Sequence, residues 1–197
     1  MPDKFNTISS PSEGIYKDKG SKFLSFAIPV KDEEAIKDIL ETYRKKYHDA
    51  RHVCYAYMLG EERNDFRAND DGEPSGTAGR PILGQINSFE LTNILIIVVR
   101  YFGGILLGTG GLVTAYKEAA VDAIRNAKII EKTIVLPLSI HFSYELMSEV
   151  SRLIKEFDLK ITDQKFEIAC DMTFAIPKSI FENVKDRFKN IYGIEII

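Results

Sequence analysis

The chain has 197 residues, of which 45% are hydrophobic and 28% charged. This is the composition of a soluble globular protein with a buried core, which excludes disordered and fibrous chains, and the length allows one domain or two small ones. The formal net charge is -3, from 26 Lys and Arg against 29 Asp and Glu. Such a chain does not coat nucleic acid through bulk electrostatics, so any contact with RNA is expected to involve a local patch.

The two cysteines, Cys54 and Cys170, lie far apart in the sequence and lack the spacing of a zinc site or a disulfide framework. Residues 1–7 have no apolar core of a signal peptide. The longest apolar run, residues 94–99, is far shorter than the roughly 20 residues that span a bilayer. We therefore expect reduced thiols, a cytoplasmic location and no membrane partner.

The first half of the chain is predicted to open with a hairpin, because residues 14–30 alternate polar and apolar around a tight turn at 18–21. Asp32 is the expected N-cap of an amphipathic helix that ends near Tyr47. Residues 52–59, rich in Tyr and Val, predict a third strand. Residues 94–99 are apolar at every position, which predicts an interior strand with both faces covered.

Two further helices are expected in this half. One has Pro81 in its first turn and ends at about Asn87. The other begins near Leu112, and its apolar positions recur at helical spacing as far as Ala127.

The amino-acid composition changes near residues 131–133, after which Gly193 is the only glycine. We place a domain boundary there, with domains at 1–132 and 133–197. The second domain is expected to contain, in order, a strand, a helix, two strands, a helix and a strand, at 134–143, 145–157, 159–164, 166–176, 179–190 and 194–197. This order, βαββαβ, is that of the ferredoxin-like fold, so the fold class is α+β with two domains.

Nine of the 13 glycines fall between Gly72 and Gly111, and eight of these lie in two blocks at 69–81 and 100–111. Each glycine in regular structure costs roughly 0.5 to 1 kcal/mol relative to alanine, so the clustering needs a geometric reason. One reason is positive φ angles and close packing of backbone. The other is exposed backbone N–H groups at helix starts, where the helix dipole favours an anion such as phosphate.

Known phosphate and calcium motifs do not match these blocks. Gly103 and Gly108 have the spacing of a P-loop, but Thr109 follows where a lysine is required. A dinucleotide fingerprint starting at Gly108 has Val113 at its last glycine position. An EF-hand loop would need a carboxylate at position 67 and a glutamate at position 78, which are Arg and Ala.

Catalysis and metal binding are not favoured by the remaining polar residues. Asp70, Asp71 and Glu73 are carboxylates that either hold a Mg²⁺ ion or pair with arginines, and acidic turn residues are more often solvated or capping groups. Ser75 lies just before a predicted helix, where a hydroxyl is an N-cap by default. His52 and Cys54 share a strand face but lack an orienting third group. We predict no catalytic residue, no metal and no cofactor.

The two blocks nevertheless carry a specific resemblance. The first runs Asp71-Gly72-Glu73-Pro74-Ser75-Gly76-Thr77-Ala78-Gly79-Arg80-Pro81, and the second runs Arg100-Tyr101-Phe102-Gly103-Gly104-Ile105, then Leu107-Gly108 and Gly110-Gly111-Leu112. Together with His52, Cys54, Ala56 and Tyr57, they resemble the IMPACT/YigZ family, in its prokaryotic form. The resemblance extends over essentially the whole chain.

The resemblance implies a first domain similar to the second domain of a small-subunit ribosomal protein and to domain IV of elongation factor G. It implies a ferredoxin-like second domain similar to domain V of that factor. Family members are regulators of translation, so the implied function is non-enzymatic binding to the ribosome, to RNA or to a translation-related protein, with no DNA specificity. Because fold analogy is a weak guide to function, a hydrolase-like enzyme using residues 69–80 and a protein–protein adaptor remain the alternatives. The oligomeric state is left open.

If the two glycine blocks converge, helix starts near Thr77 and Leu112 would offer unpaired N–H groups, and arginines would add charge-assisted bonds to the same anion. The expected anion or RNA site therefore comprises Ser75, Thr77, Arg80, Arg100, Tyr101, Gly103, Gly104, Gly108, Thr109, Gly110 and Gly111. Asp71, Glu73 and His52 are expected to support it, with the carboxylates paired to the arginines. The structural alternative is that Arg100, at the end of a buried strand, only stabilises the fold.

Overall fold

The computed structural model describes residues 3–197 and divides the chain into two compact units. One unit is Phe5–Lys132, and the other is Thr133–Ile197, with which Asp3 and Lys4 are grouped. Residues 1 and 2, which the expected first domain includes, lie outside the described residues. The strands of the described chain form three separate sheets. The molecule is thus a mixed α/β protein of two domains, as the sequence predicts.

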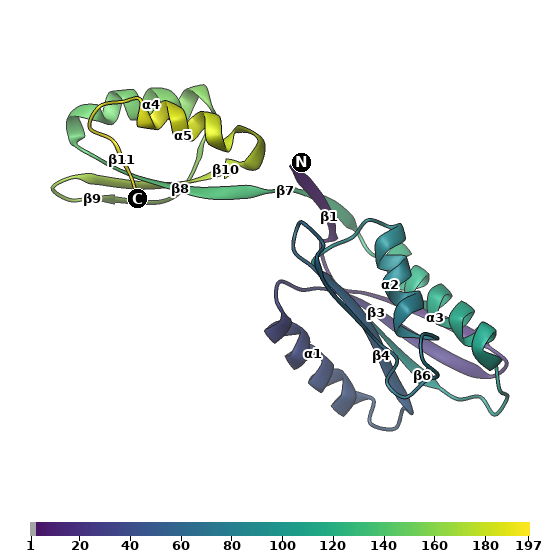
Figure 1. Cartoon of the computed structure of the whole chain (residues 1–197). Coiled ribbons are helices and arrows are strands. Elements are labelled where there is room, and N and C mark those ends of the chain that lie inside the picture. Colours follow the sequence, from purple (N-terminus) through teal and green to yellow (C-terminus); the bar gives the residue numbers. More distant parts are fainter. Residues whose placement is uncertain (1–2) are drawn as a thin grey trace. The chain divides into compact units, whose positions relative to one another are not determined.

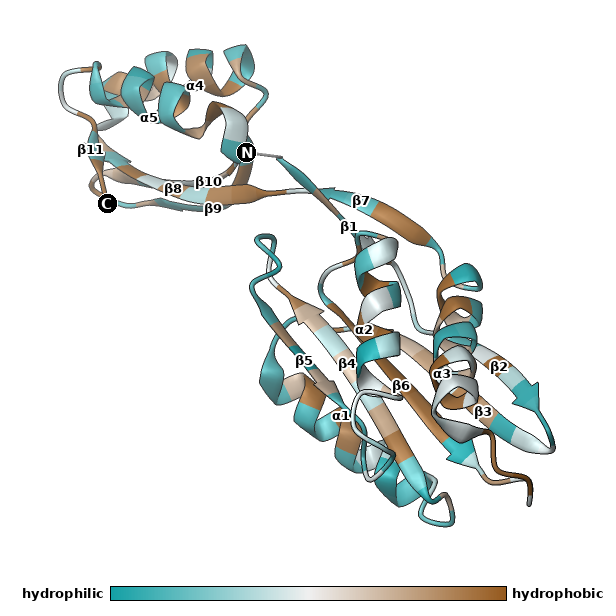
Figure 2. Ribbon diagram, turned by 45° about the vertical axis from the view of Figure 1, so that its right-hand side comes forward, coloured by the Kyte–Doolittle hydropathy of each residue, from teal (hydrophilic) through white to brown (hydrophobic). Residues whose placement is uncertain are grey.

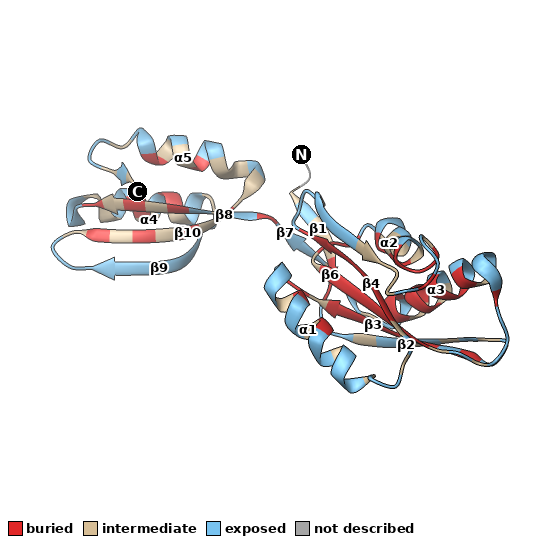
Figure 3. Cartoon of the chain, turned by 60° about the horizontal axis from the view of Figure 1, so that its bottom comes forward, coloured by how far each residue is buried: buried red, intermediate tan, exposed pale blue. Residues whose placement is uncertain are grey.

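The first unit is built on a five-stranded antiparallel sheet in the order β2-β3-β6-β4-β5. Its strands are β2 (Ser12–Asp18), β3 (Ser21–Pro29), β4 (His52–Leu59), β5 (Asp65–Asn69) and β6 (Ile94–Tyr101). The central strand, β6, is buried at every residue from Ile94 to Arg100, and Figure 3 shows it within the buried interior. The prediction of an interior strand at residues 94–99 is therefore confirmed, and β5 is a strand that the sequence analysis did not predict.

Helices cover both faces of this sheet (Figure 1). Helix α1 (Glu33–Lys46) lies on one face, and α2 (Gly79–Ser88) and α3 (Gly108–Arg125) lie on the other. Alternate residues of β6 point to opposite faces, because the side chains of a strand have a period of two. Leu95, Ile97 and Val99 therefore pack with α1, whereas Ile94, Ile96 and Val98 pack with α2 and α3. Figure 2 shows the apolar character of β6.

The boundaries predicted from the sequence hold for α1 but not for the start of α3. Asp32 is the N-cap of α1, accepting the Ala35 N–H at 2.8 Å, and Tyr47 is its C-cap, as predicted. Helix α3 begins at Gly108, four residues before the expected Leu112. Its first residue has φ of +72°, which glycine adopts at little cost. The second glycine block is therefore partly helical rather than wholly a loop.

A separate two-stranded sheet pairs β1 (Lys4–Ile8) with β7 (Ile129–Thr133). The change in composition near residues 131–133 thus falls at the end of β7, and the two units divide between Lys132 and Thr133. The Ile134 N–H donates a hydrogen bond of 2.7 Å to the Asp3 carbonyl oxygen, so Asp3 contacts the first residues of the second unit.

The second unit has the strand order β11-β8-β10-β9, in which every neighbouring pair is antiparallel. Its helices, α4 and α5, each follow a short 3₁₀ turn, so they begin later than predicted. This is the split βαβ arrangement that the element order predicts. The elements are β8 (Val135–Phe142), η1 (Tyr144–Leu146), α4 (Met147–Glu156), β9 (Lys160–Phe166), β10 (Cys170–Pro177), η2 (Lys178–Ile180), α5 (Phe181–Lys189) and β11 (Glu195–Ile196).

Buried residues of β8 and β10 alternate with partly exposed ones, and the buried set packs with residues of α4 and α5. β9 is exposed along its whole length, as Figure 3 shows. Among the described residues, no helix is long and apolar enough to cross a membrane.

Gly103 is the glycine whose lack of a side chain matters most for the fold of the second block. A Cβ added at this position would overlap the backbone of Gly20 and Ser21. The Gly103 N–H donates to the Ser21 hydroxyl at 3.2 Å. The turn between β2 and β3 therefore anchors the segment that leaves β6.

We expect Gly103→Ala to lower the free energy of unfolding by about 1–3 kcal/mol, the usual cost of overpacking. Gly84→Ala is the matched control, since Gly84 lies exposed within α2 and an added Cβ there meets nothing within 4 Å. That control should stabilise the protein by up to about 1 kcal/mol through helix propensity. Urea unfolding of both variants measures the difference, and equal effects would contradict the packing argument.

Candidate functional site

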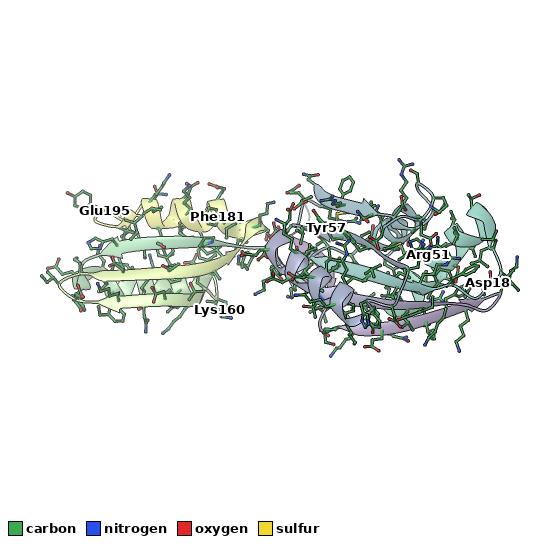
Figure 4. The ribbon with its side chains drawn as sticks, turned by 90° about the horizontal axis from the view of Figure 1, so that it is seen from below. Asp18, Arg51, Tyr57, Lys160, Phe181 and Glu195 are labelled. Carbon is green, nitrogen blue, oxygen red and sulfur yellow. The ribbon has the colours of Figure 1, made fainter. Side chains whose placement is uncertain are left out.

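The two glycine-rich segments meet at one cavity of about 370 Å³ in the first unit. Residues from β4 and from the start of α3 complete its wall. The lining residues are Arg51, His52, Gly72, Glu73, Pro74, Arg100, Phe102, Leu106, Leu107, Gly108, Thr109 and Leu112. Arg51 lies in the loop before β4 (Figure 4). The cavity thus combines apolar side chains with two arginines, a histidine and a buried carboxylate.

Strand register explains why these polar groups face the same side. Phe23 on β3, Arg100 on β6 and His52 on β4 are direct cross-strand partners, so their side chains form a row on one face of the sheet. The Arg100 guanidinium lies 5.6 Å from the Phe23 ring and 5.7 Å from the Phe102 ring. Aromatic faces attract cations, so the two rings help to hold the arginine at the cavity wall.

Glu73 is the centre of the polar network. It is 8% exposed, and its Oε1 accepts hydrogen bonds from Arg100 Nη1 at 2.6 Å and from the Tyr116 hydroxyl at 2.8 Å. The prediction that Glu73 pairs with an arginine is confirmed for Arg100. Burial, reinforced by Cys54 and Glu73, raises the pKa of Tyr116, so its phenol stays protonated and remains a donor to the carboxylate.

His52 is held in one orientation by the backbone. Its Nδ1 lies 2.7 Å from the carbonyl oxygen of Asp71, so Nδ1 carries the proton and donates it. Its Nε2 lies 3.9 Å from Glu73 Oε1. Cys54 is fully buried, and burial raises the pKa of its thiol. Cys54 is therefore a buried thiol beside a partly exposed histidine.

The first helix start does not offer free N–H groups, contrary to the sequence-based expectation. The Asp70 carboxylate accepts hydrogen bonds from the N–H groups of Gly76, Ala78 and Gly79 at 2.8, 3.0 and 2.8 Å. Burial alone would raise the pKa of Asp70, but these hydrogen bonds lower it below its ordinary value. The chain's own carboxylate therefore occupies the position that an anion would take at α2.

The start of α3 differs, because no side chain caps it. A Cβ added at Gly108 or Gly110 meets nothing within 4 Å, so the backbone is open on that side. Gly110 has no positive φ angle either, and packing gives no reason for a glycine there. Open backbone N–H groups beside Arg51 and Thr109 make this end of α3 suitable for an anion.

Several predicted site residues lie elsewhere. Tyr101 follows Arg100 on β6 and therefore points to the α1 face, where its hydroxyl donates to Asp49 Oδ1 at 2.9 Å. Gly103 is packed against Gly20. The Thr77 hydroxyl donates to the carbonyl oxygen of Pro74. The residues from the predicted set that do not line the cavity are Ser75, Thr77, Arg80, Tyr101, Gly103, Gly104, Gly110 and Gly111.

Asp71 supports the site through its backbone rather than through the predicted arginines. Its carboxylate pairs with Arg44 at 3.2 Å and accepts the Val53 N–H at 2.7 Å. The carboxylates of Asp70, Asp71 and Glu73 each have a hydrogen-bond partner within the protein. They therefore stabilise the loop that carries them. The expected pairing of Asp71 with Arg80 or Arg100 was wrong, because the Asp71 carboxylate lies beside Arg44 and Arg100 pairs with Glu73 instead.

The apolar part of the wall and the contact of Tyr116 with Glu73 were not predicted from the sequence. Phe102, Leu106, Leu107 and Leu112 line the cavity, and Leu106 is 82% exposed. The sequence did contain a signal, because the apolar residues Ile105 and Leu106 directly follow a glycine pair. The structure shows that both side chains are exposed. Exposed apolar side chains grouped in one loop mark a binding surface more often than chance.

We expect Asp70→Asn to lower the free energy of unfolding by about 2 kcal/mol at neutral pH, because a charged acceptor of three N–H groups is lost. A lowered pKa means that the Asp70 contribution is present above the unfolded value near 3.8 and is lost as the pH falls through the folded value. Urea unfolding from pH 7 to pH 2.5 should show the wild-type and Asp70→Asn stabilities converging at the acid end. A constant difference would contradict this account.

Glu73→Ala is expected to lower the free energy of unfolding by about 3–5 kcal/mol, because it leaves the buried Arg100 without a counter-charge. Glu73→Gln keeps the side-chain length and an acceptor oxygen, so its effect should be smaller. Arg80→Ala, at an exposed position on α2, is the control and should change stability by less than about 0.5 kcal/mol. Thermal and urea unfolding of the three variants test this order.

Comparisons with known proteins agree with the resemblance in the glycine blocks. The Impact N-terminal domain family matches residues 19–124. The chain is 33% identical over 171 residues to the IMPACT family member YigZ of Escherichia coli (strain K12), covering 86% of this chain and 84% of that protein. It is 30% identical over 156 residues to the IMPACT family member YvyE of Bacillus subtilis (strain 168), covering 79% and 72%.

A solved structure described as that of a hypothetical protein aligns with 100% of this chain and 98% of its own chain. The TM-score is 0.74 and the sequence identity is 28%. The family match covers more than half of the chain, and YigZ is similar over most of both sequences. The protein therefore belongs to the IMPACT family.

Proposed function

We propose that this protein is a non-enzymatic, translation-associated regulator of the cytosol that binds single-stranded RNA, on the ribosome or free, through the cavity of its first unit. Regulation of translation is what the family resemblance implies. The inferred analogies of the first unit to a small-subunit ribosomal protein and to domain IV of elongation factor G, and of the second unit to domain V, point in the same direction. The split βαβ order of the second unit supports the last of these.

The observation that carries the proposal is the uncapped start of α3 beside two arginines. Helix N-termini bind phosphate because their N–H groups and the helix dipole favour negative charge. Arg51, which is exposed, and Thr109, with its hydroxyl, line the same cavity. An RNA phosphate at this point would receive backbone, hydroxyl and guanidinium donors together.

The charge balance at the cavity favours an anion. Glu73 carries the buried negative charge, and Arg100 compensates it at 2.6 Å. Arg51 then remains as an exposed positive charge at the wall. A local patch of this kind is what an acidic protein with a net charge of -3 needs in order to bind RNA.

The same contacts favour binding over hydrolysis. A general acid or base needs a side chain that is able to exchange a proton with a substrate. The Asp70 carboxylate accepts hydrogen bonds from the start of α2, and the Glu73 carboxylate accepts them from Arg100 and Tyr116. We therefore propose that the acidic loop supports the structure of the site and takes no part in a reaction.

Binding is measured by fluorescence anisotropy of a labelled single-stranded RNA octamer at several salt concentrations. Arg51→Ala should weaken binding about three- to tenfold and reduce the slope of log affinity against log salt by about 0.7, the value for one phosphate contact on a single strand. Arg67→Ala, an exposed arginine on β5, is the matched control and should change neither quantity. Equal effects of the two substitutions would remove the cavity from the proposal.

Sedimentation of cell lysate through sucrose gradients tests the cellular partner. At low salt the protein should travel with ribosomal fractions, and it should leave them as salt rises, because phosphate contacts are weakened by counterions. A protein that stays at the top of the gradient at every salt concentration, with no RNA retained on purification, would instead support a protein–protein adaptor.

A further inference from the structure

We propose that the cavity accepts one unstacked ribonucleotide and selects RNA over DNA, with a ribose hydroxyl of that nucleotide donating to His52 Nε2. This inference rests on the proposed function and specifies its ligand. Three features of the same cavity support it: an apolar wall, an anion-binding end and a fixed hydrogen-bond acceptor.

The apolar wall suits a flat heterocycle. Pro74, Phe102 and Leu112 line the cavity, and Phe102 is 45% exposed although one guanidinium contacts its ring. Unstacked bases of single-stranded RNA pack on aromatic side chains and on arginine planes. Phe102 and the adjacent Arg100 offer such a surface in the first unit.

The anion-binding end suits the phosphate of the same nucleotide. The start of α3 has no side-chain cap, and Thr109 and Arg51 lie at the same wall. Arg100 gives a second, independent observation at this wall. It lines the cavity and is only 7% exposed, yet its Nε has no hydrogen-bond partner. Buried donors are nearly always satisfied in folded proteins.

The acceptor distinguishes ribose from deoxyribose. The hydrogen bond from Nδ1 of His52 to the Asp71 carbonyl at 2.7 Å selects, of the two neutral tautomers, the one whose Nε2 presents a lone pair. Within residues 3–197, Nε2 has no partner closer than Glu73 Oε1 at 3.9 Å, which is itself an acceptor. A ligand hydroxyl is a donor that Nε2 in this tautomer is able to accept, and the 2′-hydroxyl is the group that separates RNA from DNA.

The volume of the cavity matches one nucleotide. At about 370 Å³ it lies at the lower end of the range of small-ligand sites, about 300–1,000 Å³. We therefore propose that one base, rather than a stacked pair, enters it. The bound nucleotide must therefore leave the stack, which favours single strands and chain ends.

The test compares an RNA octamer with the DNA octamer of the same sequence, each carrying the same fluorescent label, by anisotropy at one ionic strength. The wild-type protein should bind the RNA at least tenfold more tightly. His52→Asn keeps a donor that reaches the Asp71 carbonyl but removes the acceptor at the Nε2 position. This substitution should reduce RNA affinity to the DNA level and leave DNA affinity unchanged.

Two further variants complete the design. Phe102→Ala should weaken RNA and DNA binding by a similar factor, about tenfold, since a base-stacking surface is shared by both. His48→Asn changes an exposed histidine that lies outside this cavity and should change neither affinity. Competition on the wild-type protein by AMP against deoxy-AMP repeats the sugar comparison without any variant, and AMP should be the stronger competitor.

Equal affinity of the wild-type protein for RNA and DNA would overturn this inference while leaving the proposed function in place. A similar loss of RNA and DNA binding in folded His52→Asn would overturn it as well. Binding of neither octamer would overturn the proposed function and this inference together.

Discussion

The buried contact of Glu73 with Arg100 and Tyr116 is the interaction on which the rest of the site depends. It joins the loop before α2, the end of β6 and the middle of α3, since each partner comes from a different element. A buried charge pair adds little net stability when complete, but the loss of one partner is costly. The pair therefore fixes the positions of both glycine-rich segments more than it strengthens the fold.

The two helix starts beside this contact differ in whether a side chain accepts hydrogen bonds from their N–H groups. Asp70 satisfies the N–H groups at the start of α2, so that end is closed to ligands. The start of α3 is left to solvent, next to open glycines and an exposed arginine. One acidic residue thus decides which of two similar glycine-rich helix starts remains available to an anion. The apolar loop that precedes α3 gives that end a second, non-electrostatic surface.

Much of the fold could be predicted from local pattern. The hairpin of β2 and β3, the Asp32 cap of α1 and the bounds of β4 follow from alternation, capping chemistry and β-branched or aromatic content. The site was predicted less well. Tyr101 could have been placed correctly from the sequence, because the residue after Arg100 on a strand must face the other side. Arg80 could not, since its helical position alone does not show where the loop before it lies.

The sequence by itself determined the elements, the caps of α1, the βαββαβ order of the second unit and the family, because each depends on neighbours within a few residues or on motif identity. The tertiary structure alone decided which arginine meets Glu73, which helix start is open and which side chains share the cavity. The contacts concerned join residues 27 and 43 positions apart. Such contacts arise only when β6 pairs with β3 and β4, and local periodicity carries no information about that strand order.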